Sequence, residues 1–147
     1  MERFETFTTI IANLSRSIRK IKTGEMAKWN LKSNHVSCIY YIYKNNSLTP
    51  KQLCDICEED KANVSRAIEY LEENGYVKLN PVPNKRYKRT FSLTEKGETV
   101  GRLLSDRIDE VLLRAADGVS DEQRVIMYSS LIKISESLQK IADEYVY

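Results

Sequence analysis

Apolar residues recur at steps of three and four positions in the first stretch of the chain, which predicts an amphipathic helix. They are Phe4, Phe7, Ile10, Ile11, Leu14, Ile18 and Ile21, and Gly24 is expected to interrupt the helix. Two stretches near the carboxyl end repeat the spacing: Val100, Leu103, Leu104, Ile108, Val111 and Leu112, then Val125, Ile126, Ile132, Leu138 and Ile141. Thr94 and Ser120 are the expected caps of these two helices, which Asp117-Gly118 separates.

Start and stop signals in the middle of the chain predict three shorter helices. Ser33 is expected to cap the first, which ends at the polar pair Asn45-Asn46. Thr49 is expected to cap the second, with Pro50 at the first helical position and Gln52 placed for a capping box.

The third of these helices opens after Asp60 and ends at Asn74-Gly75, where Gly75 suits a left-handed C-cap. Two strands are expected next, at Tyr76–Leu79 and Arg89–Leu93. The turn-rich segment Pro81-Val82-Pro83-Asn84 joins them, so the pair is predicted to form a hairpin. The inward face of the helix is predicted to hold Val64, Ala67, Ile68 and Leu71.

Two short helices joined by a tight turn and followed by a hairpin describe a winged helix-turn-helix, whose second helix enters the DNA major groove. The predicted fold class is therefore mainly α with a small β-hairpin wing, flanked by N- and C-terminal helices. Arginine can address guanine and asparagine can address adenine with two hydrogen bonds each. The candidate DNA contacts on the outward face are Lys61, Ala62, Asn63, Ser65 and Arg66.

The formal net charge of +2 says little about binding partners, but the distribution of charged residues along the chain is more informative. A short stretch with bases and no acid is a candidate phosphate-contacting surface, although a solvated loop has the same composition. From Tyr76 to Thr94 the bases are Lys78, Lys85, Arg86, Lys88 and Arg89.

The chain resembles the MarR family (multiple antibiotic resistance regulators). The resemblance lies in the run Leu48–Cys54, in Asp60–Val77 and in Leu93–Gly97, and the flanking helices match in position and apolar pattern. It implies a homodimeric transcription factor on palindromic double-stranded DNA, usually a repressor relieved by a small molecule, an oxidant or a metal.

We therefore predict one unit over residues 1–147. Residues 1–32 and 95–147 supply the dimerisation helices, and residues 33–94 form the winged helix-turn-helix. The terminal apolar stripes exceed what a small winged domain can cover, which independently favours a dimer.

The wing departs from the family pattern. The family often carries an aspartate that orients the following arginine toward the minor groove. Here Arg86 stands at the arginine position, but Lys85 replaces the aspartate. Arg86 is the first wing candidate and Arg89 the second, with Lys85 and Lys88 as neighbouring cations.

The cysteines and the single histidine leave two further interpretations open. His35 and Cys38, then Cys54 and Cys57, have the spacing of a zinc site, but both pairs fall within predicted helices without turns. We predict no metal and no cofactor, and we expect Cys54 and Cys57 to be small core residues. Cys38, beside Tyr40, is a candidate redox sensor, and a buried structural thiol is the alternative.

Tyr40, Tyr41 and Tyr43 are candidate lining residues for a small-molecule effector, or else margin residues of the core. No catalytic motif is present, so an enzyme is not expected. A winged-helix protein–protein adaptor that does not use DNA remains an alternative function. No apolar run approaches membrane length and no signal segment opens the chain, which predicts a cytoplasmic protein without a membrane partner.

Overall fold

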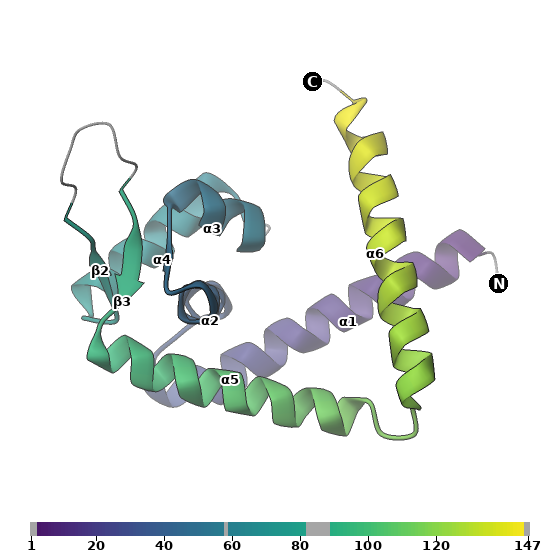
Figure 1. The fold of residues 1–147 in the computed structure, drawn as a ribbon, viewed down its shortest axis with the longest axis horizontal. Helices are drawn as coiled ribbons and strands as arrows, with labels where there is room; N and C mark the ends of the chain where they lie inside the picture. Colours follow the sequence, from purple (N-terminus) through teal and green to yellow (C-terminus); the bar gives the residue numbers. More distant parts are fainter. Residues whose placement is uncertain (1–2, 58, 82–88, 146–147) are drawn as a thin grey trace. The chain divides into compact units, whose positions relative to one another are not determined.

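The computed structural model describes residues 3–57, 59–81 and 89–145. The chain forms two compact units, residues 1–107 and residues 108–147. The second unit holds the end of α5 (Glu95–Ala115) and α6 (Asp121–Asp143), and Figure 1 gives the course of each element. Within the described residues, no helix is long and apolar enough to cross a membrane.

The first unit contains every remaining element and the start of α5. They are α1 (Arg3–Met26), the 3-10 helix η1 (Ala27–Trp29), α2 (Ser33–Asn45), β1 (Ser47–Leu48), α3 (Pro50–Cys57), α4 (Lys61–Glu73), β2 (Val77–Leu79) and β3 (Phe91–Leu93). The prediction of a mainly α fold with a small antiparallel β part is confirmed.

The core of the first unit lies where α2, α3 and α4 pack together, with β2 against α4 and β3 against α2 (Figure 1). Ile39, Ile42, Leu53 and Leu71 are its largest fully buried side chains. Burial of such a side chain contributes roughly 1.5–3 kcal/mol, so this cluster fixes the three helices relative to one another.

The β part is a three-stranded antiparallel sheet in the order β1-β3-β2, not the expected two-stranded hairpin. β1 pairs Ser47 with Ser92 and Leu48 with Phe91. A two-residue strand shows no alternation of apolar and polar positions, which is why the sequence pattern did not predict it.

Two local predictions about helix ends are also wrong. Gly24 does not interrupt α1, which continues to Met26, because a single glycine only weakens a helix. Ser33 is the first residue of α2, and the N-cap is Lys32. The Nδ1 atom of His35 accepts a hydrogen bond from the Lys32 backbone N–H at 3.1 Å, so the imidazole satisfies that donor.

Candidate nucleic-acid interface

Side-chain caps fix the starts of α3 and α4. The Thr49 hydroxyl accepts from the backbone N–H of Gln52 at 3.2 Å, and the Gln52 side chain accepts from the Thr49 N–H at 2.9 Å. Asp60 Oδ1 accepts from the backbone N–H of Asn63 at 2.8 Å. Both predicted caps are confirmed, and each satisfies backbone donors that a helix start leaves without partners.

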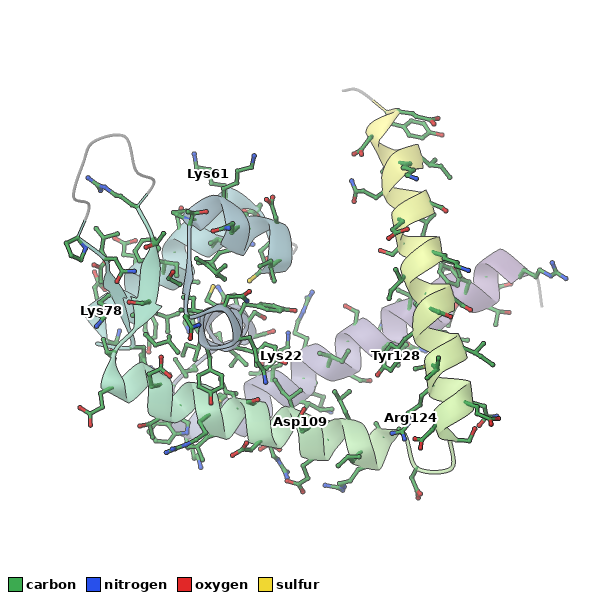
Figure 2. The ribbon with its side chains drawn as sticks, in the orientation of Figure 1. Lys22, Lys61, Lys78, Asp109, Arg124 and Tyr128 are labelled. Carbon is green, nitrogen blue, oxygen red and sulfur yellow. The ribbon has the colours of Figure 1, made fainter. Side chains whose placement is uncertain are left out.

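The inward face of α4 is buried as predicted. Val64, Ala67, Ile68 and Leu71 all lie in the core. Burial of this face turns Ala62, Ser65 and Arg66 to solvent, while Asn63 is partly buried on the flank. Lys61 is exposed at the start of the helix and points away from α2 in Figure 2.

Glu69 shares the outward face but was not among the predicted site residues. It is exposed and follows Arg66 by three positions and Ser65 by four, which places all three on one side of the helix. Helical spacing alone was enough to find it. Its carboxylate can accept from a cytosine amino group, and it repels phosphate.

The polar side chains at the start of α4 form a connected network. Asn63 Nδ2 donates to Asp60 Oδ2 at 2.9 Å and to Glu59 Oε2 at 3.2 Å. On its other side, Asn63 Oδ1 accepts from Arg66 Nη2 at 2.5 Å. Both edges of the Asn63 amide are therefore engaged within the protein.

A groove of about 970 Å³ runs between the start of α3, α4 and strand β3. Thr49, Pro50 and Lys51 line it from α3 and its cap, Lys61, Ser65 and Glu69 from α4, and Arg89 and Phe91 from the third strand and the residues before it. Lys51, Lys61 and Arg89 bring positive charge to the groove, and Glu69 and Glu72 bring negative charge.

The start of α3 is a candidate phosphate contact that the sequence prediction missed. Amide groups at a helix N-terminus favour anions, and Lys51 adds a cation beside them. The Thr49-Pro50 start signal, which the sequence shows plainly, was sufficient to identify this position.

Three of the four predicted wing cations, Lys85, Arg86 and Lys88, lie outside the described residues. Arg89 is described, is exposed and lines the groove. The base of the wing is held by side chains: Asn80 donates to the Thr90 hydroxyl at 2.9 Å and accepts from the Ser92 hydroxyl at 2.7 Å.

A second cavity, of about 550 Å³, lies between α1, α2 and α3. Of the three predicted tyrosines, only Tyr41 lines it; Tyr40 and Tyr43 are half-buried elsewhere on α2, because successive helical residues face different directions. The Lys22 ammonium lies in this cavity and donates to the Ser37 hydroxyl at 3.0 Å.

The thiols of Cys38 on α2 and Cys57 on α3 interact with each other. The Cys38 thiol donates a hydrogen bond to Cys57, and this bond together with burial raises the pKa of Cys38. The same bond, followed by the positive charge of Lys22, lowers the pKa of Cys57 despite its partial burial. Cys57 lines the second cavity, whereas Cys38 is buried.

The expectation that Cys54 and Cys57 are core residues is only half met, because both side chains are partly exposed on α3. His35 stacks on Tyr70 with ring centroids 4.3 Å apart, and so packs against α4. Among the described residues, no three histidine, cysteine or carboxylate side chains are grouped to hold a metal ion.

A MarR family model matches residues 29–86, which include α2, α3, α4 and β2. The HTH-type transcriptional regulator YybA of Bacillus subtilis (strain 168) is 25% identical over 131 residues, which are 88% of this chain and 87% of the relative. The HTH-type transcriptional regulator BilQ of Clostridioides difficile (strain CD3) is 28% identical over 98 residues, 67% of this chain and 66% of the relative.

Solved structures match the fold over nearly the whole chain. A MarR family transcriptional regulator from Listeria monocytogenes, complexed with 26mer DNA, has a TM-score of 0.84 and 25% identity over 93% of this chain and 89% of its own. MepR of S. aureus, solved as a DNA complex, has a TM-score of 0.78 and 16% identity over 90% of this chain and 97% of its own. The second similarity concerns the fold alone.

Proposed function

We propose that the chain is a winged-helix transcriptional regulator of the MarR type, not an enzyme, and that it acts as a homodimeric, ligand-responsive repressor. As a dimer it binds palindromic operator DNA with one α4 in each half-site, and a small molecule releases it.

The outward face of α4 is the observation that carries this proposal. Arg66 and Ser65 are exposed there, and the adjoining groove has Lys51, Lys61 and Arg89 along it. A base-reading helix flanked by cations fits the division of labour in protein–DNA interfaces, in which base contacts specify the sequence and phosphate contacts position the protein. The DNA complex of the Listeria regulator supports this assignment.

Exposed apolar faces on α1 and α6 support the homodimer. On α1 the side chains of Ile10, Leu14 and Ile18 are each about half exposed, at 52%, 52% and 49%. On α6 no residue is buried, although Ile132, Leu138 and Ile141 recur on it. Contiguous apolar faces of this kind mark interaction surfaces, and a second copy offers the same faces in return.

The second cavity is the proposed effector site. Leu14 and Ile18 give it an apolar wall, while Lys22, Arg19 and Tyr41 provide polar groups. This combination suits a small organic anion with an apolar body. Because α1, α2 and α3 all contribute, an occupant can alter how the helix-turn-helix sits on the terminal helix.

Duplex binding as a function of salt tests the DNA assignment. Fluorescence anisotropy should show log Kd rising with log salt concentration, with a slope of about 0.9 per phosphate contact. Lys61→Ala should weaken cognate and random duplexes alike and reduce the slope by about one contact per half-site. Lys140→Ala, on the polar side of α6, is the matched control and should change neither quantity.

The same measurement separates the rival functions. Absence of duplex binding even at low salt would contradict the proposal and favour the protein–protein adaptor, which does not use DNA. If sequence-specific duplex binding is unchanged by every small organic anion tested, the protein is still a DNA-binding regulator, but the proposed ligand response is contradicted.

The cysteine pair favours thiol-based redox sensing as a second candidate function. Cys57 has a lowered pKa beside a cavity, and Cys38 is hydrogen-bonded to it as a resolving thiol. Peroxide would oxidise Cys57 to a sulfenic acid, and Cys38 would then displace water to form a disulfide between α2 and α3. Peroxide should therefore weaken duplex binding, and Cys57→Ala should prevent that loss; equal loss in both proteins would exclude this function.

A further inference from the structure

Asn63 and Arg66 are both predicted to contact bases, but their hydrogen bonds give them different roles. Asparagine reads adenine through two bonds at once: its amide nitrogen donates to N7 and its oxygen accepts from the N6 amino group. That requires one free donor and one free acceptor on the same edge of the side chain.

The Asn63 side chain has no free donor, and one lone pair of its oxygen is already used. Its amide nitrogen carries two hydrogens, and they are directed at Asp60 Oδ2 at 2.9 Å and Glu59 Oε2 at 3.2 Å. Its oxygen accepts from Arg66 Nη2. The orientation of the amide is fixed by charge, because a flipped amide would set its oxygen against two carboxylates and its N–H₂ against a guanidinium.

Arg66 keeps most of its donors. A guanidinium has five N–H groups, and the bond to Asn63 uses only one of them. The side chain is exposed on the outward face of α4, so the remaining edge can donate to guanine O6 and N7. The hydrogen bond that Arg66 donates to Asn63 restricts a long, flexible side chain before DNA arrives.

Asp60 ties this arrangement to the backbone. One carboxylate oxygen caps the helix through the Asn63 N–H at 2.8 Å, and the other holds the Asn63 side chain. The cap of α4 and the direction of Arg66 are thus set by one carboxylate.

We infer that Asn63 is a positioning residue that orients Arg66 toward guanine, and that it does not read adenine itself. This inference rests on the proposed DNA-binding function and specifies how the start of α4 selects its base. Ordering Arg66 in advance benefits only the duplex that offers guanine, because elsewhere the side chain need not be ordered. The effect of Asn63 therefore falls on selectivity and not on general affinity.

The test is a double-mutant cycle on the full chain. A duplex selected from a random pool is changed one base pair at a time, and selectivity is the ratio of Kd for the changed duplex to Kd for the selected one at fixed salt. Arg66→Ala should lower selectivity about ten- to a hundredfold at one guanine per half-site. Asn63→Ala should lower it about two- to tenfold at that same guanine, and should add nothing in the Arg66→Ala background.

Asn63→Asp separates positioning from reading. Asn63→Asp is combined with Asp60→Asn, so that the new carboxylate does not face the carboxylate of Asp60. The new carboxylate still accepts from Arg66 but has no donor for adenine N7, so selectivity at the guanine should be largely restored relative to Asn63→Ala. Asn45→Ala is the matched control: this exposed asparagine at the end of α2 donates to the Tyr41 carbonyl at 2.8 Å and should leave selectivity unchanged. Thermal unfolding followed by circular dichroism verifies that each variant is folded.

The outcomes distinguish failure of the positioning role of Asn63 from failure of the proposed DNA-binding function. Loss of preference at an A·T pair in Asn63→Ala and Asn63→Asp, additive with Arg66→Ala, would overturn the positioning role while leaving DNA binding intact. A pool from which no duplex is enriched would overturn the proposed function itself, and the inference with it.

Discussion

Gly97 occupies a position where even a methyl group cannot be accommodated. A Cβ built there would lie 2.0 Å from the backbone oxygen of Tyr76, which also accepts the Thr94 N–H at 3.0 Å. The clashing atoms belong to the Tyr76 backbone, so they cannot move aside as the end of a flexible side chain could. We expect Gly97→Ala to destabilise the protein by about 1–3 kcal/mol or more, measured as a lower midpoint of urea unfolding.

Gly24→Ala is the control for this substitution. Gly24 lies in α1, and a methyl group added there would have nothing within 4 Å of it. Alanine there should stabilise the protein by up to about 1 kcal/mol, because it is the better helix former. Equal shifts in both variants would show that Gly97 has no packing role.

The Cys57 thiol should react before that of Cys38. The Cys38 hydrogen bond and the Lys22 charge lower the pKa of Cys57, so more of it is thiolate at a given pH. Alkylation by iodoacetamide, followed by peptide mass spectrometry across pH, measures this order. Cys38→Ala removes the hydrogen bond and should move the Cys57 reactivity curve to higher pH.

Cys54→Ala serves as the control for that experiment. Cys54 is a partly exposed thiol on the same helix as Cys57, but the Cys57 pKa does not depend on it. The curve should therefore stay in place. A curve that is unmoved by Cys38→Ala would contradict the coupling between the two thiols.

At the scale of elements, His35 joins α2 to α4. Its ring stacks on Tyr70 at an interplanar angle of 3°, and the Tyr70 hydroxyl donates to the Asn30 carbonyl at 3.0 Å. Its Nδ1 accepts from the Lys32 N–H, which requires the unprotonated nitrogen. Burial and the nearby charge of Lys32 lower the pKa of His35 below its ordinary value of 6.5.

This lowered pKa predicts a pH dependence of stability. Below about pH 6.5 the unfolded chain binds a proton at His35 that the folded chain does not, so stability is lost as pH falls toward the folded pKa. His35→Phe keeps a ring for Tyr70 but cannot titrate. Its free energy of unfolding should fall less than that of the wild type between about pH 7.5 and about pH 5.5; parallel curves would contradict the assignment.

The elements that the sequence predicted are those defined by local signals. The Thr49–Gln52 capping box, the Asp60 cap and the Ser120–Gln123 box each involve residues three positions apart, and all three are present. Helical spacing likewise placed Val64 and Ile68 in the core. Such signals act through geometry that is the same in any helix.

The features that the sequence missed depend on residues far apart in the chain. Strand β1 exists because Ser47 meets Ser92, and the close approach of Gly97 to Tyr76 joins α5 to the bend that precedes β2. The Cys38–Cys57 bond joins α2 to α3. Even the Asn63 network, although local, depends on how the loop brings Glu59 toward the helix. No periodicity in the sequence encodes these approaches.

At the scale of the whole molecule, the exposed apolar faces predict a dimer. Light scattering at micromolar concentration should report twice the chain mass of 17.1 kDa. Leu138 lies on the apolar side of α6 and is 51% exposed in the single chain. In a symmetric interface a substitution occurs twice, so Leu138→Glu should weaken association by at least about 3 kcal/mol, about a hundredfold.

Lys140→Gln is the control for this last prediction, because it lowers the net charge by the same one unit at an exposed position on the polar side of α6, two residues beyond Leu138. It should leave the mass and the association constant unchanged, since the two variants have equal net charge and differ only in the face they alter. Operator binding should weaken with Leu138→Glu alone, because an isolated subunit has one α4 and loses the second half-site. A wild-type mass of 17.1 kDa would contradict both the proposed dimer and the proposed palindromic operator. Equal weakening by both variants would instead locate the interface away from the apolar side of α6.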